Sequence, residues 1–364
     1  MHNNENAPAV KQGAQSNNQS KDTNFVENTQ LLNARFSELQ EDINDNLDRI
    51  ENEHEAGFFR VRGGNRRMAD AQAQPIPQDL YYGLMYEGEM TILFADTGIG
   101  KSIFAFQMAV KIANDGRPVL YVDLELSDKQ FQARYSVDYK NPFQFPDNLY
   151  FADISLDASI PAGTTYEDYF LNSLIDEIKR TGVKIVIIDN MTKIISTDTD
   201  KANTAKPLMD RLIDLKREHG LSLLLLEHTR KTDMFRPISI NDLQGSKMKV
   251  NFADSVFSIG RSSQDVEMRY VKQLKCRSTE IVYHTENVAV YQVKKENSFL
   301  HFDFIEHGSE YAHLKIQDED TLAERNAKII DLKNKGLSNI EIGKQVGITE
   351  GAVRKVLKKS GNIQ

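Results

Sequence analysis

The sequence predicts an α/β protein, with a mostly parallel sheet covered by helices on both faces, an antiparallel C-terminal extension of that sheet, and a small all-α domain at the end. Apolar strand-like runs alternate with helical patterns from Met90 onward. Two later runs, VKIVIIDN and LSLLLLEHT, are short, continuous and rich in β-formers, which is typical of buried parallel strands. Residues 321–364 carry short helical patterns and an excess of basic side chains. Together these patterns divide the chain into a large mixed domain and a small helical one.

Composition excludes several classes of protein. The chain has 364 residues, of which 40% are hydrophobic, so it can bury a large core. It lacks an apolar run close to the roughly 18 residues that a membrane helix needs. Its single cysteine, Cys276, cannot form an intrachain disulfide or a zinc cluster. The N-terminus lacks the apolar core of a secretory signal, so we expect a reducing, cytoplasmic setting. The net charge of −8 means that any contact with nucleic acid is regional.

The N-terminal part predicts two segments. Residues 1–26 are rich in Asn, Gln, Ser and Lys and are expected to be a disordered tail. Residues 27–79 are expected to hold an acidic amphipathic helix and a linker, RVRGGNRRMADAQAQPIPQ, that has no period. The apolar stripe of this helix comprises Leu32, Phe36, Leu39, Ile43, Leu47 and Ile50. Either the stripe packs on the chain's own body, or it is an intersubunit arm or short coiled coil.

Residues 80–305 are expected to form the large domain. The strand TILFA, the helix SIFAFQMAVKIAND, the strand PVLYVDLEL and a helix over 130–136 predict a β-α-β unit. A helix over 207–219 separates the two central parallel strands. After Asp254 the shorter runs SVFSIG, MRYVKQLK, EIVYHT, VAVYQV and FLHFDFI predict antiparallel strands. A polar linker over 306–320 leads to the C-terminal domain, 321–364.

The strongest motif is FADTGIGKS, which lies between a predicted strand and a predicted helix. Backbone N–H groups of such a loop point at phosphate oxygens, and the following helix adds its positive end. Lys101 would reach the β and γ phosphates, and Ser102 would bind Mg²⁺. The motif departs from the usual pattern by an alanine at its first position. The predicted nucleotide-binding residues are Ala95, Asp96, Thr97, Gly98, Ile99, Gly100, Lys101 and Ser102.

Hydrolysis of a nucleoside triphosphate also needs carboxylates, and two strand ends supply them. Asp189 ends the strand VKIVIIDN, where it would hold the Mg²⁺ shell. Glu125 ends the strand that we expect next to the phosphate loop and is the candidate general base, with Asp123 on the same strand face. The alternatives are a strand-capping aspartate and a surface glutamate.

With these motifs in this order, the sequence resembles the RecA-like P-loop ATPases, and more narrowly the RepA-type and DnaB-like hexameric replicative helicases. The resemblance covers about 80–293. It rests on the loop with alanine first, on VLYVDLE followed by Arg134, and on LLLLEHTRK, which implies that His228 is a γ-phosphate sensor. DLQGSKMKVNFADSV resembles the stretch that links a DNA-facing loop to the next strand and maps Gly245, Ser246, Ala253 and Asp254.

The run KQLKCRS resembles the basic pair that these hexamers insert into the neighbouring subunit's nucleotide site. It maps to Lys275 and Arg277, which alternate on one predicted strand and therefore project from the same face. Such a pair makes hydrolysis depend on assembly, because it stabilises charge on the transferred phosphoryl group. The alternatives are a basic sheet edge for this pair and a buried, hydrogen-bonded histidine for His228.

The loops that follow the two central strands are the expected contacts with single-stranded DNA. STDTDKANTAK follows the first strand, and a second loop follows LSLLLLEHT. The second loop carries the basic residues Arg230, Lys231, Arg236, Lys247 and Lys249. Copies of these loops in a ring would track the phosphate backbone of a strand. Ordinary solvated loops are the alternative.

The C-terminal domain resembles the helix-turn-helix of response regulators and sigma factors. Three short helices are expected, ending at Gly336, near Gly347 and near Ser360. If the domain binds duplex DNA, its third helix lies in the major groove. Thr349, Glu350 and Arg354 would then lie near base edges, and Lys355, Lys358 and Lys359 near phosphates. The alternative is a helical packing module or a protein-binding tail.

The resemblance implies an ATP-dependent DNA motor that uses ATP and Mg²⁺ and binds no membrane. We expect a homo-oligomer, a hexamer, that acts as a replicative helicase of a plasmid or other mobile element. The C-terminal domain supports an alternative: a nucleotide-gated DNA-binding regulator in which the ATPase core is a switch.

Overall fold

The structure is a computed structural model. It describes residues 29–44, 61–155, 158–194, 202–229, 233–244, 247–315, 319–346, 348 and 350–360. The chain divides into two compact units, Met1–Ile76 and Pro77–Gln364. The predicted tail over 1–26 lies outside the described residues, as do Leu47 and Ile50 of the predicted apolar stripe.

The first unit contains two helices. The predicted amphipathic helix is present over residues 29–44, and its apolar stripe is exposed, from 55% for Ile43 to 68% for Phe36. The second helix, α2, spans Gly64–Gln72 and buries no residue. The prediction of an aperiodic linker was wrong for these residues. The sequence GNRRMADAQ has good helix formers after its glycine, and helix propensity alone outweighed the missing apolar period.

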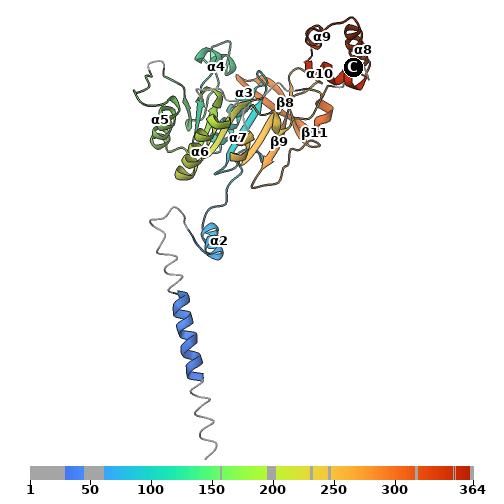
Figure 1. Ribbon diagram of the computed structural model, residues 1–364. Helices are drawn as coiled ribbons and strands as arrows, with labels where there is room; N and C mark the ends of the chain where they lie inside the picture. Colours follow the sequence, from blue (N-terminus) through green and yellow to red (C-terminus); the bar gives the residue numbers. More distant parts are fainter. Residues whose placement is uncertain are drawn as a thin grey trace, which may run out of the picture. The chain divides into compact units, whose positions relative to one another are not determined.

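The second unit is built on a nine-stranded sheet in the order β11-β10-β9-β8-β1-β7-β6-β2-β5 (Figure 1). The strands are β1 Met90–Ala95, β2 Val119–Asp123, β5 Leu149–Ala152, β6 Ile185–Asp189, β7 Ser222–His228, β8 Ser255–Arg261, β9 Met268–Cys276, β10 Val288–Glu296 and β11 Phe299–Gly308. A separate pair joins β3 Ser136–Val137 to β4 Asn141–Pro142. The strands β8, β1, β7, β6, β2 and β5 are parallel, and β9, β10 and β11 continue the sheet antiparallel.

This topology confirms the predicted central strands and antiparallel extension and corrects two details. The run SVFSIG forms β8, which pairs parallel to β1, so the antiparallel part begins one strand later than expected. The run EIVYHT is not a strand. Its backbone at Val282 and Tyr283 donates to the side-chain oxygen of Gln273, which takes the place of a neighbouring strand's carbonyl.

Helices cover both faces of the sheet. They are α3 Lys101–Asn114, α4 Asp128–Arg134, α5 Tyr166–Thr181, α6 Ala202–His219 and α7 Lys247–Phe252. One core cluster joins alternate strand residues to α5 and α6, and the other joins the opposite residues to α3 and the segment 80–85. The sheet is therefore buried on both faces, which explains why its parallel strands read as continuous apolar runs.

Residues 306–315 were predicted to be a linker, and this was wrong. β11 continues to Gly308, and a 3-10 helix, η3 Glu310–His313, follows. Glu310 is fully buried, where Lys272 Nζ donates to its Oε2 at 2.6 Å and the backbone N–H of Ile238 donates to its Oε1 at 2.7 Å. The polar composition of this segment reflects a buried polar network and not an exposed connection.

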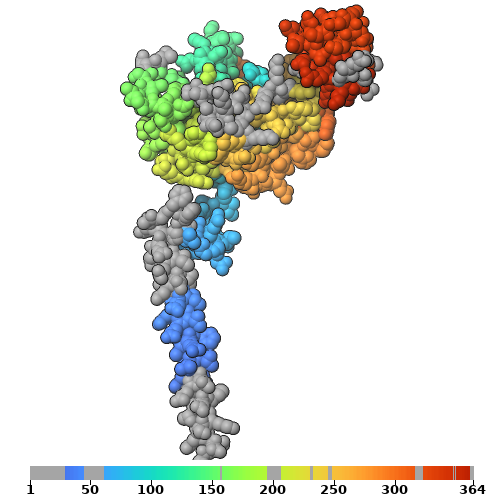
Figure 2. All heavy atoms as spheres, viewed as in Figure 1, coloured from blue at the N-terminus to red at the C-terminus, as the bar shows by residue number. Residues whose placement is uncertain are grey.

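The C-terminal residues form the three expected helices, α8 Glu319–Asn334, α9 Asn339–Val346 and α10 Glu350–Lys359. Ile329, Ile342, Val353 and Leu357 are buried together and form a small core of their own. Figure 2 shows these helices, in red, as a closely packed group. Among the described helices, none has the length and apolar character to cross a membrane.

Candidate active site

The predicted phosphate loop lies at the carboxyl end of β1 and leads into α3. Ala95, the last residue of β1, is extended and pairs with His228 on one side and Ile259 on the other. An alanine therefore fits the first position of the loop. Gly98 and Gly100 have φ of 74° and 108°, in the left-handed region where a side chain would be strained. A Cβ on Gly100 would also come within 3.0 Å of the Phe302 ring.

The amino end of α3 has the properties of an anion site. Its N-cap is Gly100, which provides no side-chain cap, and its first turn contains no acidic residue. The free N–H groups of that turn, together with the helix dipole, favour a negative group there. Lys101, 7% exposed, donates to the carbonyl of Ala95 at 3.0 Å and forms no ion pair among the described residues. Burial lowers the pKa of Lys101, and the nearby carboxylates of Asp189 and Glu125 oppose that shift.

His228 ends β7 beside this loop, where the sequence predicts a phosphate sensor. Its Nδ1 lies 3.3 Å from Lys101 Nζ, and its Nε2 lies 4.0 Å from a carboxylate oxygen of Glu125. Partial burial lowers the pKa of His228, and the positive charge of Lys101 lowers it further. The ring is therefore neutral at physiological pH, and only one of its nitrogens carries a proton.

Asp189 ends β6 and is 1% exposed. Burial raises its pKa to about 6, against the opposing hydrogen bonds from the Ser102 and Tyr121 side chains. The Tyr121 hydroxyl donates to Asp189 Oδ2 at 2.8 Å. Ser102 and Asp189 are thus adjacent, as a shared Mg²⁺ requires. The described residues contain no group of three His, Cys, Asp or Glu side chains that could hold a metal alone, so phosphate oxygens must complete the coordination.

Glu125 and Asp123 follow β2, and here the structure corrects one expectation. β2 is not the neighbour of β1, because β7 and β6 lie between them. Glu125 nevertheless approaches the site, since residues beyond β2 lie next to β6, where Asp123 pairs in register with Asp189. Asp123 accepts from the backbone N–H groups of Glu125 and Leu126, both at 2.9 Å, and so fixes the turn that carries Glu125.

Two further residues of the site were missed by the sequence reasoning. Asn190, fully buried, lies between Glu125 and His228, and its Nδ2 donates to Glu125 Oε1 at 2.6 Å. Arg269 of β9 donates from Nε to the carbonyl of Ile99 at 3.0 Å and so braces the phosphate loop. Asn190 directly follows Asp189 at a strand end, a position that could have been predicted. Nothing local in the sequence relates Arg269 to the loop.

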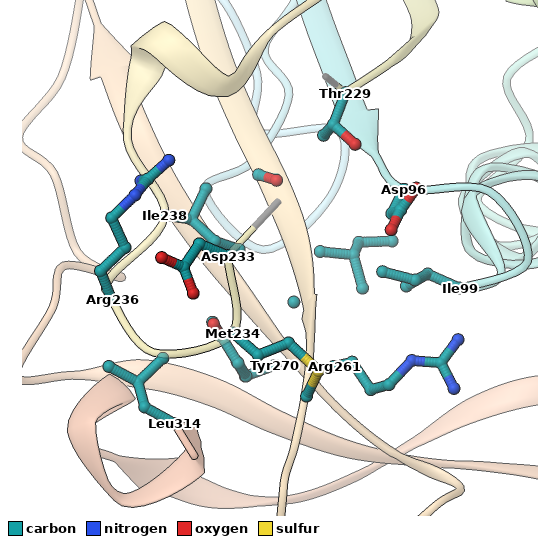
Figure 3. A pocket seen from close by; sticks show the side chains of 13 residues that line it. Asp96, Ile99, Thr229, Asp233, Met234, Arg236, Ile238, Arg261, Tyr270 and Leu314 are labelled. Carbon is teal, nitrogen blue, oxygen red and sulfur yellow. The ribbon is translucent and has the colours of Figure 1, made fainter. Parts of the chain in front are cut away.

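A small cavity of about 140 Å³ lies on the β8 side of the phosphate loop (Figure 3). Asp96 and Thr229 lie on one side of it and Asp233 and Arg236 on the other. Arg236 forms a two-pronged ion pair with Asp242, with its NH1 2.9 Å from Oδ2. The segment after β7 is therefore held beside the loop by its own charges.

Residues 65–234 match a protein family described as an AAA domain. The match includes the loop, Glu125, Asp189 and His228 and ends just after β7. This chain contains a P-loop ATPase domain. The largely parallel nine-stranded sheet that carries it fits a RecA-like core. The match begins at residue 65, before the boundary near Leu80 that the sequence predicts.

Individual relatives are distant. The DNA repair protein RadA of Campylobacter jejuni is 22% identical over 153 residues, which are 41% of this chain and 30% of RadA. The chain thus spans less than a third of that relative's length. Among solved structures, a KaiC-like protein, PH0186 of Pyrococcus horikoshii, is 18% identical and covers 60% of this chain and 90% of its own, with a TM-score of 0.43. A second solved structure, an isolated ATPase domain, is 16% identical and covers 65% and 95%, with a TM-score of 0.47.

Lys275 and Arg277 lie far from the active site of their own P-loop ATPase domain. β9 runs antiparallel to β8, so its end at Cys276 lies opposite Ser255, at the amino edge of the parallel strands. There Lys275 Nζ donates to the carbonyls of Val250 and Ala253, and Arg277 NH1 donates to Asp254 at 2.9 Å. A role in the neighbouring subunit's site stays a prediction.

The predicted DNA contacts of the second loop fare differently. Lys249 is 1% exposed and forms a 2.6 Å ion pair with buried Glu227, which contradicts the prediction that Lys249 contacts DNA. Its position on the inner face of α7 explains the burial. Arg230, Lys231, Gly245 and Ser246 lie outside the described residues, and of Lys247 only the position in α7 is described. The loop STDTDKANTAK is described only from Ala202, where α6 begins.

On α10 the basic residues Arg354, Lys355, Lys358 and Lys359 are all exposed. Arg354 donates to Glu350 at 2.6 Å, one helical turn earlier. The charges therefore lie on the surface of α10, while Val353 and Leu357 face the small core. Thr349 lies outside the described residues. Duplex recognition by this helix stays a prediction.

Proposed function

We propose that this protein is an ATP-driven DNA motor, a hexameric replicative helicase of a plasmid or other mobile element. The observation that carries the proposal is the convergence of Lys101, Glu125, Asp189 and His228 at one edge of the sheet. A slow nucleotide switch has little need of a base within reach of a sensor. Glu125 would activate water, Lys101 and the end of α3 would hold phosphates, and Ser102 and Asp189 would hold Mg²⁺.

The proposal of DNA as partner rests on three observations. The matched relative RadA is described as a DNA repair protein. The loops predicted to contact a strand leave β6 and β7 at the same edge as the active site. The C-terminal helices expose basic side chains on α10. Hydrolysis at this edge would therefore be felt directly by loops that hold a strand.

The ring is proposed from Lys275 and Arg277. Both lie at the opposite edge of their own sheet, so they cannot serve their own phosphate loop. A basic pair delivered to a neighbour's site would make each active site depend on two subunits.

The test is to mix two inactive variants. Lys101→Ala removes the phosphate lysine but keeps Arg277, and Arg277→Ala does the reverse. We expect each alone to lose Mg²⁺-dependent ATP hydrolysis, and the mixture to recover part of the DNA-stimulated rate, because some interfaces then pair an intact loop with an intact Arg277. Arg180→Ala, which removes an exposed arginine on α5, is the matched control and should hydrolyse ATP normally. A mixture as inactive as its components would contradict the shared site.

A second candidate, the nucleotide-gated DNA-binding regulator, is favoured by the separate core and basic surface of α8, α9 and α10. In this case the protein would bind one duplex sequence tightly, hydrolyse ATP and leave duplexes closed. Binding to random duplexes of the same length, compared with a selected sequence, separates the two functions. A preference of more than about 10³-fold would favour the regulator.

A further inference from the structure

Asn190 joins the two groups on which hydrolysis would depend. It follows Asp189, is fully buried, and has contacts on three sides. Its Nδ2 lies 2.6 Å from Glu125 Oε1 and 3.1 Å from His228 Nε2, and its Oδ1 accepts from the backbone N–H of Thr192 at 3.0 Å. A buried side-chain amide with all its partners inside the active site has a role beyond filling space.

The orientation of this amide is fixed twice. The Thr192 N–H can only donate, so it requires Oδ1 on its side, and the Glu125 carboxylate accepts, so it requires Nδ2 on its side. Turning the amide over would place Oδ1 against the Glu125 oxygen and lose both hydrogen bonds. Nδ2 therefore presents its second hydrogen to His228 Nε2.

The hydrogen bonds around His228 conflict with one another. Lys101 Nζ, which can only donate, lies 3.3 Å from Nδ1, while the Asn190 amide donates toward Nε2. A neutral imidazole has one donor and one acceptor nitrogen, so it cannot accept on both sides. Since Asn190 cannot turn, the contact that can yield is that of Lys101, which has a long, flexible side chain. The site is satisfied once Lys101 turns toward phosphate and leaves Nδ1 free to carry the proton.

We infer that Asn190 is a positioning residue that sets the tautomer of His228, so that Nδ1–H points at the phosphate site, while the same amide holds the Glu125 carboxylate. Sensor and base are thus tied through one side chain. Loss of the Nδ1–H donor weakens recognition of the terminal phosphate, and loss of the Nδ2 donor frees Glu125. This inference rests on the proposed use of ATP.

The decisive variant is Asn190→Asp, which keeps the shape of the side chain but replaces the donor by an acceptor. The new carboxylate favours a proton on His228 Nε2 and repels Glu125. Asn190→Ala, which removes both contacts without adding a charge, is the second variant in case the aspartate disturbs folding. Thr192→Ala is the matched control, because it changes the neighbouring side chain and keeps the backbone N–H that Asn190 uses.

Two readouts other than hydrolysis test the inference on the full chain. The first is the ratio of affinities for a non-hydrolysable imido analogue of ATP and for ADP, by titration with Mg²⁺ present. A hydrogen bond to a charged phosphate predicts that the wild type and Thr192→Ala prefer the analogue by about 10-fold or more. Both Asn190 variants and His228→Ala should lose most of this preference while keeping their affinity for ADP.

The second readout is the tautomer itself, by nitrogen NMR of chains labelled at histidine, with His228→Ala identifying the signal. With the analogue bound, we expect a proton on Nδ1 in the wild type and on Nε2 in Asn190→Asp. A proton on Nε2 in the wild type, or an unchanged affinity ratio in both Asn190 variants, would overturn the inference and leave the ATPase proposal intact. A wild type that binds neither nucleotide would overturn both.

Discussion

The two edges of the central sheet treat buried charge in opposite ways. At the amino edge, Asp254 accepts from Lys216 at 2.7 Å, from Arg277 and from the backbone N–H of Met90, and these partners hold its pKa below the ordinary value despite burial. At the carboxyl edge, burial raises the pKa of Asp189 to about 6. Asp123, on the neighbouring strand, also has its pKa raised by burial, and its Oδ2 lacks a hydrogen-bond partner among the described residues.

This difference separates stability from function within one sheet. Within the described part of the chain, no cationic side chain forms an ion pair with Asp189, and Lys101 nearby forms none either. Buried charges without partners cost free energy, and they persist where a ligand supplies the partner. The carboxyl edge is thus preorganised for phosphate and Mg²⁺, and the amino edge contributes to folding.

The largest effect is expected at the carboxyl edge, on the rate. Glu125→Gln removes the base but keeps an oxygen for the Asn190 amide, so nucleotide affinity should change little. Hydrolysis should fall by roughly 10²–10⁴-fold, the usual contribution of a general base. Single-turnover hydrolysis and nucleotide titration measure the two quantities. A reduction below about 10-fold would assign the base to another residue.

The next effect is expected at the amino edge, on stability. Asp254→Ala leaves Lys216 without its carboxylate and removes the acceptor of the Met90 N–H. We expect a loss of about 3–5 kcal/mol in the free energy of unfolding. Denaturant titration monitored by circular dichroism measures this loss. Asp153→Ala, at an exposed position beyond β5, is the control and should lose almost nothing.

Asp189→Asn should have the opposite sign in the nucleotide-free protein. A carboxyl group with an ordinary pKa of 3.8 and a folded pKa of about 6 makes the folded state progressively less stable as pH rises between those values. Above pH 6 the variant should therefore exceed the wild type by at most about 3 kcal/mol, with the gap closing below pH 4. Thermal unfolding across this range measures it, and a gap independent of pH would show that Asp189 is not destabilising.

The smallest effect is expected for Arg277→Ala in the unassembled chain. The Arg277 side chain is 56% exposed, and Asp254 keeps Lys216. The free energy of unfolding should fall by less than about 1 kcal/mol. Denaturant titration at a protein concentration where the chain is monomeric measures this change. A loss as large as that of Asp254→Ala would make Arg277 a structural residue and weaken its proposed role in a neighbour's site.

The sequence predicts most of the core because its signals are local. The loop before α3 and the apolar runs of β6 and β7 depend on residues adjacent in the chain. The position of β2 in the sheet and the burial of Lys249 do not, because Lys249 is buried by Glu227, 22 positions away. Basic composition predicts exposure, and here one long-range ion pair overrides it.

The candidate site divides in the same way. Lys101, Asp189 and His228 follow from motifs at strand ends. Asn190 and Arg269 act through contacts with residues far along the chain, such as the 3.0 Å hydrogen bond from Arg269 to Ile99, 170 positions away. Such contacts exist only after the sheet order is set, so no periodicity or spacing encodes them.

Strand displacement on a forked DNA duplex, with ATP and Mg²⁺, tests the proposed motor most directly. The full-length chain should separate the strands, and Lys101→Ala, which retains the fold but loses the phosphate lysine, should not. Unwinding by the wild type alone is the result that the proposal predicts. Tight duplex binding and active ATP hydrolysis without strand separation would contradict it and favour the nucleotide-gated regulator.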